Sequence, residues 1–223
     1  AYNRGQILYR LAEMLESRRD EFQNLLKGTS NPTLSPDTEV ACSIDRLVAF
    51  AGWADKHAQV LGCNNPVSGP YYNFTSPEPV GVVAAIASDD APLLSLISLV
   101  APALCAGNTI VAIGAESNMP VASALGEVCA TSDVPAGVIN ILTGLRSELT
   151  PPIASHRDID AVHASGLSAA AAESLRAGTA ENLKRVQIRS LHGDAWLDAD
   201  ACESPWWIEP FVELKTIWHP SGT

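Results

Sequence analysis

The chain has few basic residues: 14 Lys and Arg stand against 25 Asp and Glu, so the formal net charge of its 223 residues is −11. Such a charge repels phosphate backbones and anionic membrane surfaces, so we expect neither nucleic acid nor a membrane as a partner. The sequence also lacks a signal-peptide pattern and any uninterrupted apolar run of about 18 residues. We therefore expect a cytoplasmic protein.

Paired cysteines and metal-ligand spacings are missing as well. The five cysteines form no CxxC pair, and the five histidines form no HExxH pattern. We interpret the cysteines as reduced thiols, several of them in the core, and the histidines as solvated or capping residues. The residues concerned are Cys42, Cys63, Cys105, Cys129 and Cys202, with His57, His156, His163, His192 and His219.

Residues 1–63 show the apolar spacing of two amphipathic helices that pack on a sheet. In the first helix, Asn3 and Gln6 can form a reciprocal cap. The second is expected to begin after Ser35, a cap residue followed by proline, and to end at Gly62. Because this pattern is already helical at its first residue, we expect the chain to be part of a longer protein.

Residues 64–79 mix turn formers with strand formers and have no helical period. Prolines as frequent as these are excluded from a central strand, so the segment predicts a β-hairpin that projects from the body. An ordinary loop is the alternative.

Residues 80–190 alternate short apolar runs with helical patterns. Repeated βα units whose strands are apolar on both faces predict an α/β fold, a doubly wound parallel sheet of the Rossmann type. The expected strands are 80–87, 109–113, 138–142, 160–164 and 185–189, and the expected helices are 93–105, 121–131, 146–155 and 168–176.

Residues 191–210 are turn-rich and contain Trp196, Trp206 and Trp207, while residues 211–218 alternate like one last strand. Two interpretations of the tryptophans stay open, because buried aromatic side chains serve both. They cover an otherwise bare edge of the sheet, or they anchor another domain.

Several stretches resemble the aldehyde dehydrogenase superfamily, in that family's order. They include Glu78-Pro79-Val80-Gly81-Val82-Val83, the run from Ala101 to Val111 with its Cys105-Ala106-Gly107-Asn108-Thr109, and Val134-Pro135-Ala136-Gly137-Val138-Ile139-Asn140. The resemblance covers residues 4 to about 190 and again about 209 to 220. It implies a Rossmann-type cofactor domain, but fold alone does not establish activity.

The residues that carry out this family's chemistry are replaced. Asp90 stands where the family has the asparagine that donates to the oxyanion, and Arg189 stands where it has the general-base glutamate. An ionised carboxylate offers no donor, and an arginine accepts no proton. Residues 191–210 are too few to hold the catalytic domain with the nucleophilic cysteine, and Cys202 lacks the family's surrounding motif. The resemblance therefore implies a domain without catalytic activity.

The resemblance also implies that NAD does not bind. In Ile113-Gly114-Ala115-Glu116 the family's ribose-binding lysine is lost at Ile113 and Glu116 remains. In Gly166-Leu167-Ser168, Leu167 replaces the serine that meets the pyrophosphate at a helix start.

The role implied by the resemblance is structural. The hairpin at 64–79 and the strand in 211–223 correspond to the family's oligomerisation flap, and residues 191–210 to a linker in place of the catalytic domain. The partner implied is a catalytic aldehyde dehydrogenase domain, in the same or a partner chain of a homodimer. This arrangement resembles family 16 aldehyde dehydrogenases and some bifunctional proline-utilisation flavoenzymes. The expected interface residues are Tyr71, Tyr72, Phe74, Phe211, Glu213, Lys215, Ile217 and Trp218.

Two alternatives stay open. The first is a regulatory module that still senses NAD through Glu116 and the helix at Ser168. The second is an enzyme with a new site around Asp89, Asp90 and Cys202, although paired aspartates are more often a solvated turn or a helix cap.

Overall fold

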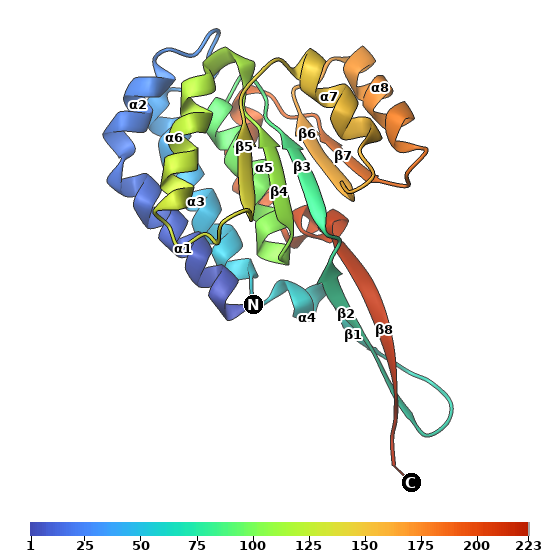
Figure 1. Ribbon diagram of the computed structural model, residues 1–223. Helices are drawn as coiled ribbons and strands as arrows, with labels where there is room; N and C mark the ends of the chain where they lie inside the picture. The colour runs from blue at the N-terminus through green and yellow to red at the C-terminus, as the bar shows by residue number, and fades with distance from the viewer. Residues whose placement is uncertain (223) are drawn as a thin grey trace.

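The computed structural model describes residues 1–222, so Thr223 of the predicted tail lies outside the described residues. The chain forms a five-stranded parallel sheet in the order β5-β4-β3-β6-β7 and a separate three-stranded antiparallel sheet, as Figure 1 shows. The predicted α/β fold is confirmed. The main strands are β3 (Val82–Ile86), β4 (Thr109–Ile113), β5 (Ile139–Leu142), β6 (Ala161–Ser165) and β7 (Arg185–Arg189), all close to the predicted ranges.

The main sheet is covered on both faces. Alternate residues of β3 enter two different cores, with Val83 and Ala85 in one and Ala84 and Ile86 in the other. The first core contains α5 (Pro92–Ala106) and α6 (Met119–Ala130), and the second contains α7 (Arg146–Ser155) and α8 (Ala169–Thr179). Figure 1 shows these two pairs on opposite sides of the sheet. This period-two division is what a doubly wound sheet requires.

The N-terminal region differs from the prediction. It contains α1 (Tyr2–Ser17), α2 (Arg19–Leu26), α3 (Pro36–Trp53) and α4 (His57–Leu61) instead of two helices. Asn3 lies inside α1, and no side chain of the described residues caps that helix at Ala1. Ser35 does cap α3, because its Oγ accepts from the backbone N–H of Thr38 at 3.1 Å. The second helix was predicted to reach Gly62 but ends earlier, since Lys56 donates from Nζ to the Gly52 carbonyl and from its backbone N–H to the Trp53 carbonyl.

The predicted hairpin is present and is part of a flap, which we define as β1 (Cys63–Asn65), β2 (Tyr71–Pro79) and β8 (Val212–Pro220). β2 pairs antiparallel with β1 and, along its whole length, with β8. In Figure 1 the flap projects away from the main sheet, with the C-terminus near its tip.

Residues 191–211 contain four short helical segments: η2 (Gly193–Leu197), α9 (Ala199–Cys202), η3 (Pro205–Trp207) and η4 (Glu209–Phe211). Trp196 and Trp207 are buried in the chain's own core, whereas Trp206 is 63% exposed. Two of the three tryptophans therefore belong to this domain's packing.

Cys105, Cys129 and Cys202 are buried free thiols, as predicted. The histidine prediction is wrong for His163, which is fully buried and contacts the Leu99 carbonyl in the middle of α5. His57 is buried too, but its ring contacts the carbonyl of Trp53, the last residue of α3, as a capping residue does. Within residues 1–222, no helix has both the length and the apolar character needed to cross a membrane.

Candidate functional site

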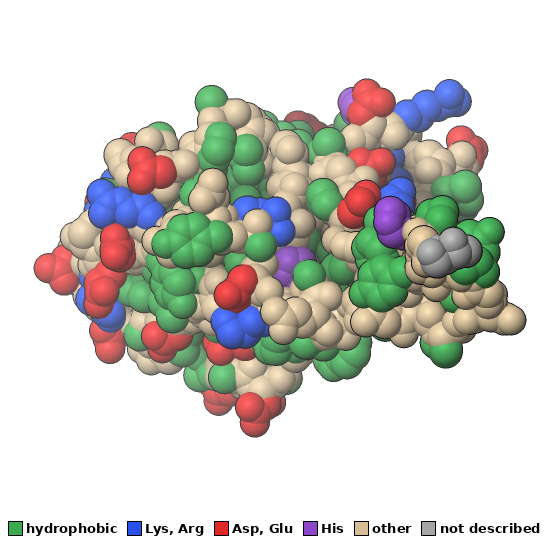
Figure 2. All heavy atoms as spheres, turned by 90° about the horizontal axis from the view of Figure 1, so that it is seen from below, with side chains coloured by type: hydrophobic (Ala, Val, Ile, Leu, Met, Phe, Trp, Pro, Cys, Tyr) green, Lys and Arg blue, Asp and Glu red, His purple; other side chains and the backbone are tan. Residues whose placement is uncertain are grey.

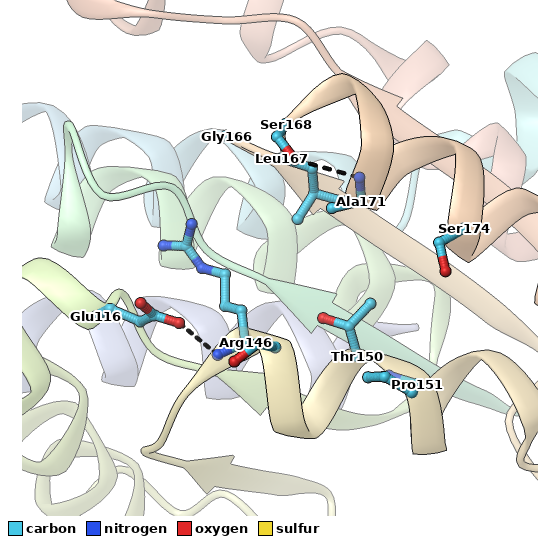
Figure 3. Close-up of a pocket in the computed structure, with 10 residues that line it drawn as sticks. Glu116, Arg146, Thr150, Pro151, Gly166, Leu167, Ser168, Ala171 and Ser174 are labelled. Atoms are coloured by element: carbon cyan, nitrogen blue, oxygen red, sulfur yellow. Dashed lines mark hydrogen bonds between the residues drawn. The ribbon is translucent and has the colours of Figure 1, made fainter.

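A crevice of about 440 Å³ lies between α7 and α8, beyond the carboxyl ends of the central strands (Figure 3). The order of the sheet reverses between β3 and β6, and open α/β sheets bind ligands at such a switch point. The crevice is lined by Glu116, Arg146, Ser147, Thr150, Pro151, Gly166, Leu167, Ser168, Ala171 and Ser174. Four of the five positions that the resemblance gave as degenerate cofactor positions, Glu116, Gly166, Leu167 and Ser168, are therefore brought together. The fifth, Ile113, lies apart from these four, because its side chain is buried in the second core.

One wall of the crevice is a network of polar groups. The Glu116 carboxylate accepts the backbone N–H of Arg146 at the start of α7. The Arg146 Nη2 atom lies 2.5 Å from Asp89 Oδ1, which also accepts the backbone N–H of Ser117 at 3.0 Å. Nothing in the spacing of the sequence pointed to Arg146, because its partners lie far away in the chain.

The opposite wall is the turn from β6 into α8. Gly166 has φ +67°, and a Cβ there would overlap Ser88 Oγ, so only glycine fits. Leu167 packs against the second core. Ser168 Oγ accepts the Ala171 N–H at 3.2 Å and so caps α8. The serine hydroxyl is therefore used to begin the helix.

Asp90 holds two separate loops together. Its Oδ1 accepts from the Ser88 hydroxyl, and its Oδ2 accepts the Gly193 N–H at 2.8 Å and lies 3.0 Å from His192 Nδ1. The Asp90 side chain is mostly buried. Its carboxylate therefore fixes the start of the segment that follows β7.

Arg189 is also part of the packing. Its Nε donates to His163 Nε2 at 3.1 Å, and its guanidinium lies 4.1 Å from the centre of the Trp207 ring, a cation–π distance. Burial lowers the pKa of Arg189 to about 10, so it stays charged at neutral pH. Burial also lowers the pKa of His163 well below its usual range, with the Arg189 charge a smaller cause. A neutral His163 fits, since its Nδ1 donates to the Leu99 carbonyl at 3.0 Å while Nε2 accepts.

Cys202 does not join the two aspartates in one site. Its Sγ lies 3.6 Å from the Ala195 carbonyl, and burial raises the pKa of this thiol, which opposes a nucleophilic role. Asp89 is paired with Arg146, and Asp90 with His192. The three residues of the suggested new site thus have separate partners.

Most of the predicted interface residues lie on the flap, and Figure 2, which views the molecule from below, shows hydrophobic side chains on this part of the surface. Tyr71 and Trp218 form an edge-to-face pair with ring centroids 5.8 Å apart, and Glu213 pairs with Lys215 at 2.7 Å. Phe211 is an exception: it is 0% exposed, because it packs in the core against His163.

Comparison with known proteins places these features in a family. A sequence model described as the aldehyde dehydrogenase family matches residues 1–191. Retinal dehydrogenase 2 of Gallus gallus is 35% identical over 190 residues, which are 84% of this chain and 36% of that protein. Omega-crystallin of Enteroctopus dofleini is 33% identical over 189 residues, 84% of this chain and 38% of that protein. Cytosolic aldehyde dehydrogenase 1 of Elephantulus edwardii is 32% identical over 190 residues, with shares of 84% and 37%.

The fold is similar to that of solved structures. The NAD⁺ complex of aldehyde dehydrogenase from Bacillus cereus matches with a TM-score of 0.78 and 29% identity, over 84% of this chain and 38% of that one. The chain thus spans 36–38% of the length of these relatives. Because the matched residues 1–191 include all five strands of the main sheet and the helices on both of its faces, the chain belongs to the aldehyde dehydrogenase family.

Proposed function

We propose that this chain is a non-catalytic aldehyde dehydrogenase-like domain with a structural role in a larger enzyme. The observation that carries the proposal is the flap, whose strand β8 has no partner on its outer edge within residues 1–222. An unpaired strand edge is a template for pairing with another sheet.

The proposal that the domain has no catalytic activity rests on Asp90 and Arg189. These residues align with the family's oxyanion donor and general base, and both are held in packing contacts. Cys202, which lies between Arg189 and the C-terminal strand, is buried, and burial raises the pKa of its thiol. Residues 191–210 stand, in this proposal, where the family has its catalytic domain. One relative, Omega-crystallin, is named as a crystallin and not as a dehydrogenase.

The register of the flap defines which atoms a partner strand would meet. Val80 N–H donates to the Phe211 carbonyl at 3.3 Å, and Ser221 N–H donates to the Pro70 carbonyl at 2.9 Å, one bond at each end of the β2–β8 ladder. In an antiparallel ladder such pairs alternate, so Glu213, Lys215 and Ile217 bond β2. The N–H and C=O groups of Leu214, Thr216 and Trp218 then point to the outer edge.

The proposed partner is a catalytic aldehyde dehydrogenase domain, in the same chain or in the second chain of a homodimer. Strand pairing would hold it through backbone hydrogen bonds, and the exposed Leu214 and Trp218 would add apolar contact. Within the family, the second domain of family 16 aldehyde dehydrogenases is the arrangement we favour. A cytoplasmic location is proposed with it, since one relative is named as cytosolic.

The test is a proline on the outer edge of the full-length protein. Thr216→Pro removes one outward N–H and leaves the backbone bonds to β2 in place, because proline is tolerated where its nitrogen faces away from the ladder. Thr216→Val keeps both the N–H and the strand propensity and is the matched control. Thr216→Pro also removes the 3.1 Å hydrogen bond between the Thr216 and Thr75 hydroxyls, which the control variant lacks as well. We expect light scattering to show loss of assembly for Thr216→Pro alone. Normal assembly of the proline variant would contradict the flap role.

The persistence of the crevice favours a second candidate, a regulatory module that binds NAD. The residues fit this cofactor only in part: Glu116 faces the crevice, but Leu167 stands at the helix start and the Ser168 hydroxyl is bonded to the Ala171 N–H. Helix starts bind phosphates through free N–H groups. Because one of these N–H groups is already bonded to Ser168, the start of α8 is a poor site for the pyrophosphate. Calorimetric titration with NAD and NADH tests this candidate, and saturable heat would favour it over a purely structural role.

A further inference from the structure

A second hollow, a groove of about 350 Å³, lies on the other side of α7 and is lined mostly by apolar side chains. Its floor is the face of the main sheet that belongs to the second core. Val111 of β4 lies on this face because it is two residues before Ile113, and Leu142 of β5 is paired with Ile113 in the register. Leu149 of α7 forms part of the facing wall. The groove shares no lining residue with the crevice between α7 and α8.

The groove marks a part of the sheet that the helices on this face leave uncovered. In Figure 1, α7 and α8 lie on the side of β6 and β7, away from β5 at the opposite edge. Val82 and Val111 are consequently only half-buried, and Leu142 is 42% exposed. Strands of a parallel sheet are normally buried on both faces, and exposed apolar patches mark binding sites. The volume of the groove falls in the range of small-molecule pockets.

Polar side chains line the groove at one end, in the turn between α7 and β6. They are His156 and Asp158. The His156 Nδ1 atom accepts the backbone N–H of Asp158 at 3.2 Å, and the Nζ atom of Lys184 donates to the His156 carbonyl. These two bonds hold the turn, so Asp158 is already in position before a ligand binds.

The charge at this end of the groove is negative. The Asp158 carboxylate is bonded to no other side chain among residues 1–222. Burial lowers the pKa of Lys184, and the nearby carboxylates of Asp160 and Asp158 act against that effect. Two carboxylates thus share one ammonium group, while the exposed Arg157 is not part of the lining. The excess negative charge favours a ligand with a cationic group at this end.

We infer that this groove binds a primary amine with a compact apolar body, such as an alicyclic or aromatic amine. The ammonium group of the ligand lies against the Asp158 carboxylate, and its apolar body covers Val111, Leu142 and Leu149. Because an exposed ion pair contributes little, most of the affinity comes from the apolar contact and the charge supplies the selectivity. The inference does not depend on the structural role of the flap.

Three probes of similar shape test the inference: cyclohexylmethylamine, cyclohexylmethanol and cyclohexanecarboxylate, which are cationic, neutral and anionic. Each is titrated into the 223-residue chain, and binding is followed by the amide NMR shifts of residues 149–159. We expect saturable shifts with the amine, at least about threefold tighter than with the alcohol, and the weakest binding with the carboxylate.

Three results would overturn the inference. The first is the absence of saturable binding of the amine. The second is binding of the alcohol or the carboxylate that is as tight as binding of the amine. The third is a set of shifts confined to residues 166–174, which would place the amine in the crevice between α7 and α8.

A substitution tests the ion pair. Asp158→Asn keeps the shape of the side chain and removes its charge, so the amine is expected to bind no more tightly than the alcohol. Asp133→Asn makes the same change in net charge at an exposed position outside the groove, and is expected to keep the preference for the amine. An unchanged preference in the Asp158→Asn variant would exclude the proposed contact. Thermal unfolding of both variants checks that they are folded.

Discussion

In the proposed function, Asp90 and Arg189 stabilise the fold and take no part in catalysis. The resemblance puts these two residues at catalytic positions of the family. In the structure, Asp90 joins the loop after β3 to Gly193, and Arg189 lies between His163 and Trp207. Each side chain carries a charge that suits these contacts and does not suit the role that the family's residue has at that position. Restoring a family residue at one position should therefore cost stability without creating activity.

Asp90→Asn tests that expectation. Asparagine recovers the family's residue but replaces one carboxylate oxygen with a donor, so the bonds from Gly193 N–H and the Ser88 hydroxyl can no longer both be kept. We expect the free energy of unfolding in urea to fall by about 1–2 kcal/mol, with no aldehyde-dependent formation of NADH. Asp133→Asn, at an exposed position with φ +59°, is the neutral control. Undiminished stability of Asp90→Asn would mean that the carboxylate is no anchor.

Glu39 predicts a dependence of stability on pH. Its Oε1 accepts the N–H groups of Leu93 and Leu94 at 2.7 and 3.1 Å, and burial raises the pKa of this carboxyl from 4.5 to about 7. The folded chain therefore binds more protons than the unfolded chain between these values. Protonation of Glu39 therefore adds to the free energy of unfolding. This contribution is fully present below pH 4.5 and is lost as the pH rises towards 7, a change of about 3 kcal/mol.

Glu39→Gln isolates this effect. Glutamine keeps the Oε1 acceptor and stays neutral, so the variant should gain stability relative to the unmodified chain as the pH rises from 4.5 to 7. His57 and His163, whose pKa values burial lowers, act in the opposite direction in both proteins and cancel in the comparison. Urea unfolding at pH 5 and pH 8 measures the difference, with the exposed Glu173→Gln as control. If the free energies of unfolding of the two proteins change by the same amount between pH 5 and pH 8, titration of Glu39 is ruled out.

At the scale of elements, the flap and the 191–211 segment play different parts. The flap strands mostly contact one another, whereas Trp196, Trp207 and Phe211 are in the main core. The last strand should therefore be dispensable for folding, and the segment before it should not be.

Two truncations compare these elements. A chain that ends at Val212 loses β8 and keeps every buried tryptophan, so its near-UV circular dichroism should stay native. A chain that ends at Glu203 also loses Trp207, Ile208 and Phe211, and should be destabilised by at least about 3 kcal/mol because each is a large buried side chain. If both truncations unfold alike, β8 is part of the core and the division between the two elements is wrong.

At the scale of the whole molecule, the net negative charge opposes assembly of two copies. The net charge of −11 makes two copies of the chain repel each other, while strand pairing through the flap depends on backbone bonds and apolar side chains. Assembly of the full-length protein should therefore persist or strengthen when NaCl is raised from about 0.1 to about 1 M, where the screening length falls to about 3 Å. Sedimentation velocity measures this, and dissociation at high salt would indicate an interface held by ion pairs.

The sequence by itself determined the features that depend only on neighbouring residues along the chain, namely the helices, the strands and their caps. Alternating βα patterns predicted the five strands, with β4 and β7 at their observed bounds, and Ser35 marked the start of α3 because caps and periodicity are local properties. Only the tertiary structure decided the partners of individual side chains. The pairs Arg146–Asp89 and Arg189–His163 depend on residues far away in sequence. Which backbone N–H and C=O groups of β8 point outward likewise depends on the register between β2 and β8, two strands far apart in sequence. Only pairing with β2 decides which residues of β8 use these groups inside the sheet.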